Sequence, residues 1–259
     1  MNAEPILIID CDSVLEKIEG FIRDRVALSG RSCAVVGLSG GVDSTVTAYL
    51  CCRVLGREKV RGIILPYKGS HPYSIAHAEG VVEELGIQSS TIDITGAVDT
   101  CAGHCTDPDR VRKGNIIARV RMIFLYDQAH LHDGLVVGTT NKTELLLGYL
   151  TKYGDGGVDI EPLAGLYKTQ VWQLAGHLGV SKDIIGKPPT ADLWEGQTDE
   201  GELGFTYRDV DRLFHALYEE GLRGEGLRAR GFRSDFIEAV RAKVSASSHK
   251  RNAPPAADL

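Results

Sequence analysis

One glycine-rich segment of the chain combines the residue types and the spacing that bind a phosphate group. Residues 37–45, GLSGGVDST, follow a short apolar run and lead into a segment of helical character. The first amides of a helix are unpaired, its dipole favours anions, and glycines let the backbone approach a phosphate without a Cβ clash. The carboxylate of Asp43 would repel a phosphate, but it suits a Mg²⁺ ion that bridges phosphates. The segment therefore predicts a phosphate-binding loop with a metal ligand; the alternative is a glycine-rich turn in which Asp43 and Ser44 only cap a helix.

This loop differs from the two commonest nucleotide-binding motifs. It lacks the Lys-Ser/Thr ending of a Walker A loop, and it does not have GxGxxG spacing. It resembles the SGGxDS loop of the ATP pyrophosphatase, or PP-loop, enzymes. Those enzymes cleave ATP between the α and β phosphates, leave AMP on an acceptor oxygen and hold the departing pyrophosphate in this loop.

A second group of motifs lies further along the chain. Residues 138–144 read GTTNKTE, residues 149–159 read YLTKYGDGGVD, and residues 188–193 read PPTADL. Together with SGGVDS they resemble ammonia-dependent NAD synthetases, and the resemblance extends from about Leu15 to Arg251. It implies a ligase that forms a C–N bond: deamido-NAD is amidated with ammonia to NAD, with ATP and Mg²⁺, through an acyl-adenylate, and AMP and pyrophosphate are released.

The resemblance also implies roles for particular residues. Asp43 and Glu144 match two Mg²⁺ ligands and Lys168 matches a lysine on the ATP phosphates, so these three form the expected catalytic set. The residues expected to bind ATP are Gly37, Leu38, Ser39, Gly40, Gly41, Val42, Asp43, Ser44, Arg121, Thr139, Lys168 and Thr190. The residues expected to bind deamido-NAD are Asn115, Arg119, Lys152, Asp155, Asp159, His249 and Lys250. Asp155 is further expected to favour ammonium as it arrives. Taken alone, Glu144 and Lys168 could be surface residues, and either threonine could be a cap.

The elements that must position these residues alternate between strand and helix. Short runs at 33–38, 59–65, 89–94 and 135–138 indicate strands, with helical patterns between them. This alternation predicts an α/β fold: a Rossmann-like doubly wound parallel sheet with helices on both faces, followed by a helical C-terminal part. Ligands of such sheets bind beyond the carboxyl ends of the strands. We expect a single domain over 1–250 and a disordered tail over 251–259.

A long helix is expected at 110–132, and it carries two arginines. Its apolar side is predicted to hold Ile116, Val120, Ile123, Phe124 and Leu131. Arg119 and Arg121 cannot share a helix face, since residues two apart diverge by about 200°. They are therefore expected to serve different ligands, unless one of them is a surface charge.

Composition and cysteine usage argue against several classes of protein. The chain has 259 residues and a formal net charge of −6, which disfavours a nucleic-acid coat protein or a polybasic membrane binder. No membrane span or signal peptide is recognised, so a cytoplasmic enzyme with reduced thiols is expected. Cys101, His104 and Cys105 lie close together, but without a second ligand pair we expect two ordinary thiols rather than a zinc site.

The expected partners are small molecules, without nucleic acid or membrane, and members of the family pair as homodimers. Glutamine-dependent NAD synthetases carry an additional amidohydrolase domain, for which 259 residues leave no room. Free ammonia or a separate glutaminase is therefore the expected nitrogen source. Ile64 departs from the family pattern, because many members have an arginine there, and this leaves the adenine contacts at 65–67 open.

The same motifs allow two other interpretations of the function. The first is another PP-loop enzyme, either an amidating one or a tRNA-thiolating one that would use Cys101 or Cys105 as a sulfur carrier. A thiolating enzyme would bring a basic RNA surface, which the net charge and the KYGDGGVD segment argue against. The second is a non-catalytic nucleotide-binding module, which would keep SGGVDS but would not need Glu144 and Lys168.

Overall fold

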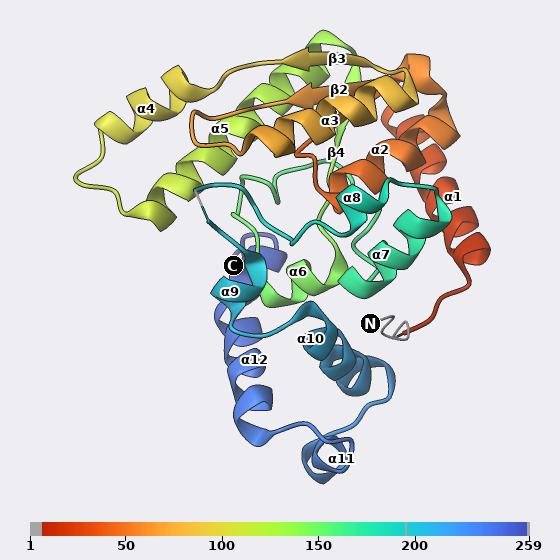
Figure 1. The fold of residues 1–259 in the computed structure, drawn as a ribbon, viewed down its shortest axis with the longest axis vertical. Coiled ribbons are helices and arrows are strands. Elements are labelled where there is room, and N and C mark those ends of the chain that lie inside the picture. The colour runs from red at the N-terminus through yellow and green to blue at the C-terminus, as the bar shows by residue number, and fades with distance from the viewer. Residues whose placement is uncertain (1–6, 195, 258–259) are drawn as a thin grey trace.

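A parallel β-sheet of four short strands forms the centre of the computed structural model, which describes residues 7–194 and 196–257 (Figure 1). The strands are β1 (Cys33–Gly37), β2 (Val60–Ile64), β3 (Gln88–Thr91) and β4 (Gly134–Val137). Their order is β3-β2-β1-β4, and Ala34 of β1 is in register with Val60 on one side and Leu135 on the other. The four strands predicted from the sequence are confirmed, with ends shifted by a few residues.

Both faces of the sheet are covered by helices. Successive side chains of a strand point to opposite faces, so Ala34 and Val36 enter one hydrophobic core and Val35 enters another. The first core receives α1 (Cys11–Ser29), α2 (Val42–Leu55) and α3 (Pro72–Leu85), and the second receives α4 (Thr95–Gly103) and α5 (Arg110–Leu131). The predicted doubly wound arrangement is therefore confirmed.

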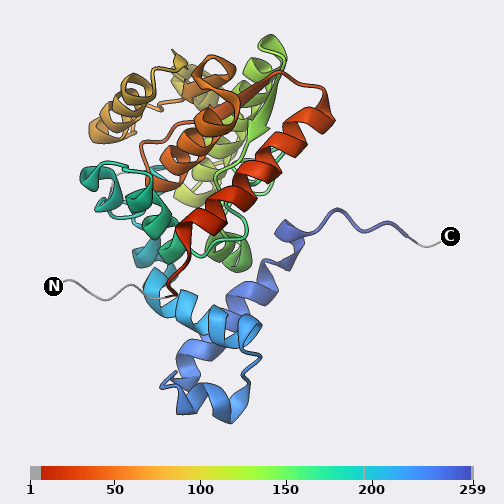
Figure 2. The ribbon, with the colours of Figure 1, turned by 90° about the vertical axis from the view of Figure 1, so that its right-hand side faces the viewer.

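The remainder of the chain is helical, as predicted. Its elements are α6 (Lys142–Leu147), α7 (Lys168–His177), α8 (Lys182–Ile185), α9 (Asp199–Leu203), α10 (Tyr207–Phe214) with a π-helical turn at His215–Glu219, α11 (Gly224–Ala229), α12 (Ser234–Ala246) and α13 (Ser248–Arg251). The helices α10 to α12 form a lobe beside the sheet layers, seen in blue in Figures 1 and 2. Fully buried Tyr207 and Phe214 anchor its core.

The strand order creates one crevice at the edge of the sheet. The chain steps outward from β1 to β2 and β3, and then returns to place β4 on the other side of β1. Loops that leave two neighbouring strands in opposite directions open a gap between them, and this switch point is where such folds bind ligands. Here the gap lies between the loop after Gly37 and the loop after Val137.

The prediction for the apolar side of α5 was partly wrong. Val120 is buried and Ile116 and Phe124 pack against the core as predicted, whereas Ile123 and Leu131 are 59% and 67% exposed. Helix α1 is capped by Asp10, whose side chain accepts a hydrogen bond from the Ser13 amide.

The C-terminal end of the described chain also contains a helix. Arg251, which we expected to begin the tail, ends α13, and its guanidinium donates to the carbonyl oxygens of Leu146 and Val244. Residues 253–257 have no regular structure and extend away from the rest of the molecule (Figure 2). Within the described ranges, no helix is long and apolar enough to cross a membrane.

A matched pair of α1 variants tests the packing of this helix. Ile22 is fully buried, whereas Leu28 on the same helix is 78% exposed. We expect Ile22→Ala to lower the free energy of unfolding by about 2–5 kcal/mol, because the variant loses apolar burial and leaves a cavity. Leu28→Ala should change it by less than about 0.5 kcal/mol. Urea unfolding followed by circular dichroism measures both, and equal losses would contradict the packing.

Candidate active site

The glycine-rich loop joins the end of β1 to the first turn of α2. Gly40 has a φ of +70°, and a Cβ atom there would lie 2.1 Å from the carbonyl oxygen of Ser74, so no other residue fits this position. Gly41 is the N-cap of α2 and has no side-chain cap. Ser39 Oγ accepts a hydrogen bond from the Gly41 amide at 3.3 Å and lies 3.1 Å from Ser44 Oγ. Neither Asp43 nor Ser44 caps α2, so the capping role that the alternative gave them is not observed.

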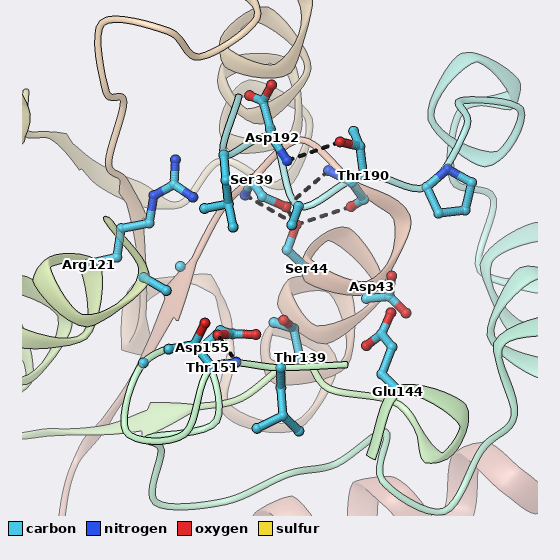
Figure 3. A pocket seen from close by; sticks show the side chains of 18 of the residues that line it. Ser39, Asp43, Ser44, Arg121, Thr139, Glu144, Thr151, Asp155, Thr190 and Asp192 are labelled. Atoms are coloured by element: carbon cyan, nitrogen blue, oxygen red, sulfur yellow. Dashed lines mark hydrogen bonds between the residues drawn. The ribbon is translucent and has the colours of Figure 1, made fainter. Parts of the chain in front are cut away.

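Asp43 lies in the first turn of α2 and contacts residues from distant parts of the chain. Lys168 Nζ donates to Asp43 Oδ2 at 2.5 Å and to Glu144 Oε1 at 3.2 Å. Figure 3 shows the carboxylates of Asp43 and Glu144 turned toward one another at one side of the pocket. The three residues of the expected catalytic set are therefore brought together, although 125 positions separate Asp43 from Lys168.

The electrostatics of this cluster follow from burial. Lys168 is 2% exposed. Burial alone would lower its pKa, but the Asp43 and Glu144 carboxylates outweigh this and raise the pKa of Lys168, so it stays an ammonium group. Burial raises the pKa of Glu144, while the Lys168 charge opposes the rise. One ammonium group thus lies between two carboxyl groups, and a further cation at this place would favour the ionised form of Glu144.

Asn141 fixes the position of Glu144 relative to Asp43. Its Oδ1 accepts from the Glu144 amide at 3.0 Å, and the Glu144 carboxylate accepts from the Asn141 amide at 3.3 Å, which forms a capping box on α6. Its Nδ2 donates to Asp43 Oδ1 at 3.0 Å. Asn141 was not among the predicted site residues, although an asparagine three positions before a glutamate is a recognisable capping signal.

Asp211 of α10 ties together the helices that carry Glu144 and Lys168. It is fully buried and accepts hydrogen bonds from Thr143 Oγ1 at 2.5 Å, from the Thr169 amide at 2.9 Å and from Thr169 Oγ1 at 2.8 Å. Burial raises the pKa of Asp211 to about 6, although these donors favour its charged form. Sequence reasoning missed it, because an aspartate in an amphipathic helix gives no sign of burial.

A cavity of about 380 Å³ opens in front of the cluster, at the switch point of the sheet. The predicted residues that line it are Gly37, Leu38, Ser39, Gly41, Val42, Asp43, Ser44, Asn115, Arg121, Thr139, Glu144, Asp155, Lys168, Thr190 and Lys250. Gly40 belongs to the loop but is not among the residues that line the cavity. Lining residues that the sequence did not point to include Ser74, Lys187 and Asp199. Single residues of these types give no signal until the fold brings them together.

Arg121 lines the cavity from α5, at the side opposite to Asp43 and Glu144 (Figure 3). Its guanidinium donates to Leu65 O at 3.2 Å and lies 3.5 Å from Ser70 Oγ. Ile64 ends β2 just before this contact, and Leu65 and Pro66 line the cavity. Arg121 thus supplies a cation beside the strand end where Ile64 replaces the arginine common in the family pattern.

Two threonines expected at the nucleotide line the cavity, as Figure 3 shows. Thr190 Oγ1 also accepts a hydrogen bond from the Asp192 amide at 3.0 Å, so it shapes its own turn. Thr139 lies between β4 and the capped start of α6.

The residues expected at the dinucleotide divide into two groups. Asn115, Asp155 and Lys250 line the cavity, and Thr151 links the first two: its Oγ1 donates to Asn115 Oδ1 and its amide to Asp155 Oδ1, both at 2.8 Å. Lys250 Nζ donates to the carbonyl oxygens of Gly148 and Leu150. The C-terminal helix α13 therefore contributes directly to the cavity wall.

The second group lies outside the cavity. Arg119 Nε donates to the Lys152 carbonyl at 3.3 Å, and Lys152 Nζ donates to the His249 carbonyl at 2.5 Å, so these three form a separate basic cluster. The divergence of Arg119 and Arg121 expected from helix geometry is thus observed. Asp159 accepts from the Val136 amide and from the Tyr126 hydroxyl, which ties it to β4 and α5. Contacts of these four residues with a dinucleotide stay a prediction.

Cys101, His104 and Cys105 lie at the C-terminal end of α4, and all six cysteines are free thiols. In the part of the chain that the structure describes, no group of three or more His, Cys, Asp or Glu side chains is arranged to hold a metal ion.

Comparison with known proteins identifies the family. The model of the family described as NAD synthase matches residues 14–254. The chain belongs to the NAD synthase family. A curated NH(3)-dependent NAD(+) synthetase from Trichlorobacter lovleyi is 46% identical over 95% of this chain and 90% of its own length.

Two solved structures share the NAD synthase fold of this chain. The NH3-dependent NAD synthetase from Campylobacter jejuni superposes with a TM-score of 0.84 at 30% identity, covering 97% of this chain and all of that one. A structure described as NMN synthetase from Francisella tularensis gives a TM-score of 0.87 at 33% identity over the same shares.

Glu161 supports the turn that carries Thr139 and allows a test by pH. Its carboxylate accepts from the Thr140 amide at 3.1 Å and fills the space where a Cβ of Gly138 would lie. Burial raises the pKa of Glu161 to about 8. Because the folded protein binds this proton more tightly than the unfolded chain, the contribution to stability is complete at low pH and is lost as the pH rises to about 8.

We therefore expect the stability of the wild-type protein to fall relative to Glu161→Gln between about pH 5 and 8.5, by roughly 1–3 kcal/mol. Urea unfolding of both proteins at the two pH values measures this change. The exposed Glu83 on α3 supplies a control, since Glu83→Gln should follow the wild type. Parallel profiles for the wild type and Glu161→Gln would contradict the burial argument.

Proposed function

We propose that this protein converts deamido-NAD to NAD by ATP-dependent amidation with ammonia, and releases AMP and pyrophosphate. The observation that carries the proposal is the convergence of the SGGVDS loop, Asp43, Glu144 and Lys168 on one cavity at the switch point. Membership of the NAD synthase family and the names of its curated relatives support the reaction.

The site can do this chemistry mainly by positioning charge. A carboxylate is a poor electrophile, so adenylation must come first, and it requires two anionic substrates to approach one another. The free amides at the start of α2 and the Ser39 and Ser44 hydroxyls offer donors to phosphate oxygens. Arg121 supplies a cation at the opposite side of the cavity. These groups are held in place before the substrate arrives, which is the condition for electrostatic catalysis.

Asp43 and Glu144 fit a Mg²⁺ ion by their chemistry. Both side chains end in carboxyl groups, they face one another, and they share the single ammonium group of Lys168. Mg²⁺ is commonly held by one or two carboxylates together with substrate phosphates and water, so a full protein cage is not required. When bound, the ion would neutralise phosphate charge.

Asp155 is placed to attract the ammonium ion that supplies the nitrogen. Its carboxylate reaches the cavity and is oriented by the Thr151 amide at 2.8 Å. Burial raises its pKa, while the charges of Lys250 and Arg121 oppose the rise. An anionic group at this place attracts ammonium, which must lose a proton before it attacks the acyl-adenylate.

The proposal also covers the oligomeric state, the cellular location, the nitrogen source and the domain organisation of the protein. We infer a homodimer, supported by exposed apolar side chains of α5 such as Ile123 and Tyr126, and a cytoplasmic location. The nitrogen source would be free ammonia or a separate glutaminase, and the NH(3)-dependent curated relatives support this. A single domain over 1–250 is supported by the reach of the family model, 14–254.

A direct assay tests the reaction. The protein is incubated with ATP, Mg²⁺, ammonium chloride and deamido-NAD, and we expect NAD, AMP and pyrophosphate in equal amounts. Glutamine in place of ammonia should give no NAD, and EDTA should abolish turnover. Asp43→Asn and Glu144→Gln should each lower kcat on the order of 100-fold. The exposed Glu79 supplies the control Glu79→Gln, which should match the wild type.

A second carboxylate substrate tests the substrate specificity of the enzyme. Amidation of nicotinate mononucleotide would give NMN, the product in the name of the Francisella tularensis protein. We expect deamido-NAD to be used with the higher kcat/KM. Formation of ADP instead of AMP, or no NAD under any of these conditions, would contradict the proposal.

A further inference from the structure

Lys187 is a partly buried lysine whose ammonium group lies against the phosphate loop. It stands just after α8, and its Nζ donates to Ser74 Oγ at 2.9 Å and lies 3.5 Å from the carbonyl oxygen of Gly40. Lys187 and Ser74 both line the cavity. Three segments far apart in the sequence, from the loop, from α3 and from the chain after α8, therefore meet at one positive charge.

The charge of Lys187 is not matched by a carboxylate. Over residues 7–194 and 196–257, no Asp or Glu oxygen forms an ion pair with Lys187 Nζ within 4.0 Å. Asp192 attracts it only from a greater distance, and burial lowers the pKa of Lys187. Its two hydrogen-bond partners are neutral. A partly desolvated ammonium group with neutral partners costs free energy that an anion in the cavity would recover.

The charge of Lys168, unlike that of Lys187, is paired with carboxylates. Lys168 is 2% exposed and its charge is compensated by Asp43 and Glu144. Attraction between Lys168 and a phosphate is therefore offset by repulsion from the carboxylates around it. Of the two lysines on the cavity wall beside the loop, Lys187 is the one with charge to offer an anion.

The position of Lys187 also suits the end of a triphosphate. The glycine-rich loop presents its amides at the start of α2, and Lys187 lies against Gly40 within that loop. Arg121 lies at another side of the cavity, on α5. A polyphosphate held by the loop would thus have one end within reach of Lys187.

We propose that Lys187 binds the β- and γ-phosphates of ATP and holds the pyrophosphate that leaves. This rests on the proposed function. In that reaction a carboxylate oxygen of the nicotinate attacks the α-phosphorus, the bond from this phosphorus to the oxygen bridging to the β-phosphorus breaks, and its electron pair leaves with pyrophosphate. The ammonium group of Lys187 stabilises the negative charge that develops on this leaving group.

Binding of inorganic pyrophosphate to the free full-length protein tests the assignment, with Mg²⁺ present and calorimetry as the readout. Lys187→Met keeps the length of the side chain and removes its charge, and it should weaken the affinity about 10- to 100-fold, as expected for a hydrogen bond to a charged group. Lys187→Arg should recover most of the loss. Lys182, exposed on the neighbouring α8, supplies the control Lys182→Met, which should stay within about 2-fold of the wild type.

Salt dependence separates phosphate binding from a purely structural role. If Lys187 contacts the phosphates, the affinity of Lys187→Met should depend less steeply on salt than that of the wild type. An affinity of Lys187→Met within 2-fold of the wild type, an unchanged salt dependence, or no binding of pyrophosphate to the wild type would each overturn the proposal.

The test is independent of the dinucleotide and of ammonia. A wild-type protein that binds pyrophosphate through Lys187 but makes no NAD would reject the proposed function and keep the assignment. Normal NAD synthesis together with an unchanged pyrophosphate affinity in Lys187→Met would keep the proposed function and reject the assignment of Lys187.

Discussion

The ammonium group of Lys168 holds the carboxyl groups of Asp43 and Glu144 together at a place where all three side chains are largely buried. Asp43 follows β1 and Glu144 follows β4, the two neighbouring strands at the switch point of the sheet. Their ion pairs with Lys168 span 2.5 and 3.2 Å. A buried arrangement of this kind depends on further hydrogen bonds for its stability, and much of the surrounding structure supplies them.

Two residues, Asn141 and Asp211, connect this cluster by hydrogen bonds to other parts of the fold. Asn141 binds Asp43 and caps the helix of Glu144, so the loops after both strands are fixed by one amide side chain. Asp211 binds the residues next to Glu144 and Lys168, which connects the cluster to the C-terminal lobe. The lobe is therefore part of the site's support. The site combines an inward-facing negative pair with cations placed further out, at Arg121 and Lys187, and this explains how a chain of net charge −6 can attract polyanionic substrates.

The strands of the sheet and the residues in distinctive motifs could be predicted from the sequence. The SGGVDS loop and the capped glutamate at 144 have local signals, because their backbone conformation and spacing are set by neighbouring residues. The supporting residues lack such signals. Asp211 and Lys187 act through partners more than 40 positions away, so only the tertiary structure shows that one is buried and the other unpaired. The apolar side of α5 was predicted correctly at Val120 but not at Ile123 or Leu131, because only the tertiary structure shows which part of a long helix is covered.

Lys168 couples the loops of the two strands before any ligand binds. A double-mutant cycle of Asp43→Asn and Lys168→Met, measured as the free energy of unfolding in the absence of nucleotide and metal, tests it most directly. Residues in one buried ion-pair network deviate from additivity, and we expect a coupling of about 1–3 kcal/mol. Losses that add to within about 0.3 kcal/mol would show that the two side chains act independently and would contradict the account.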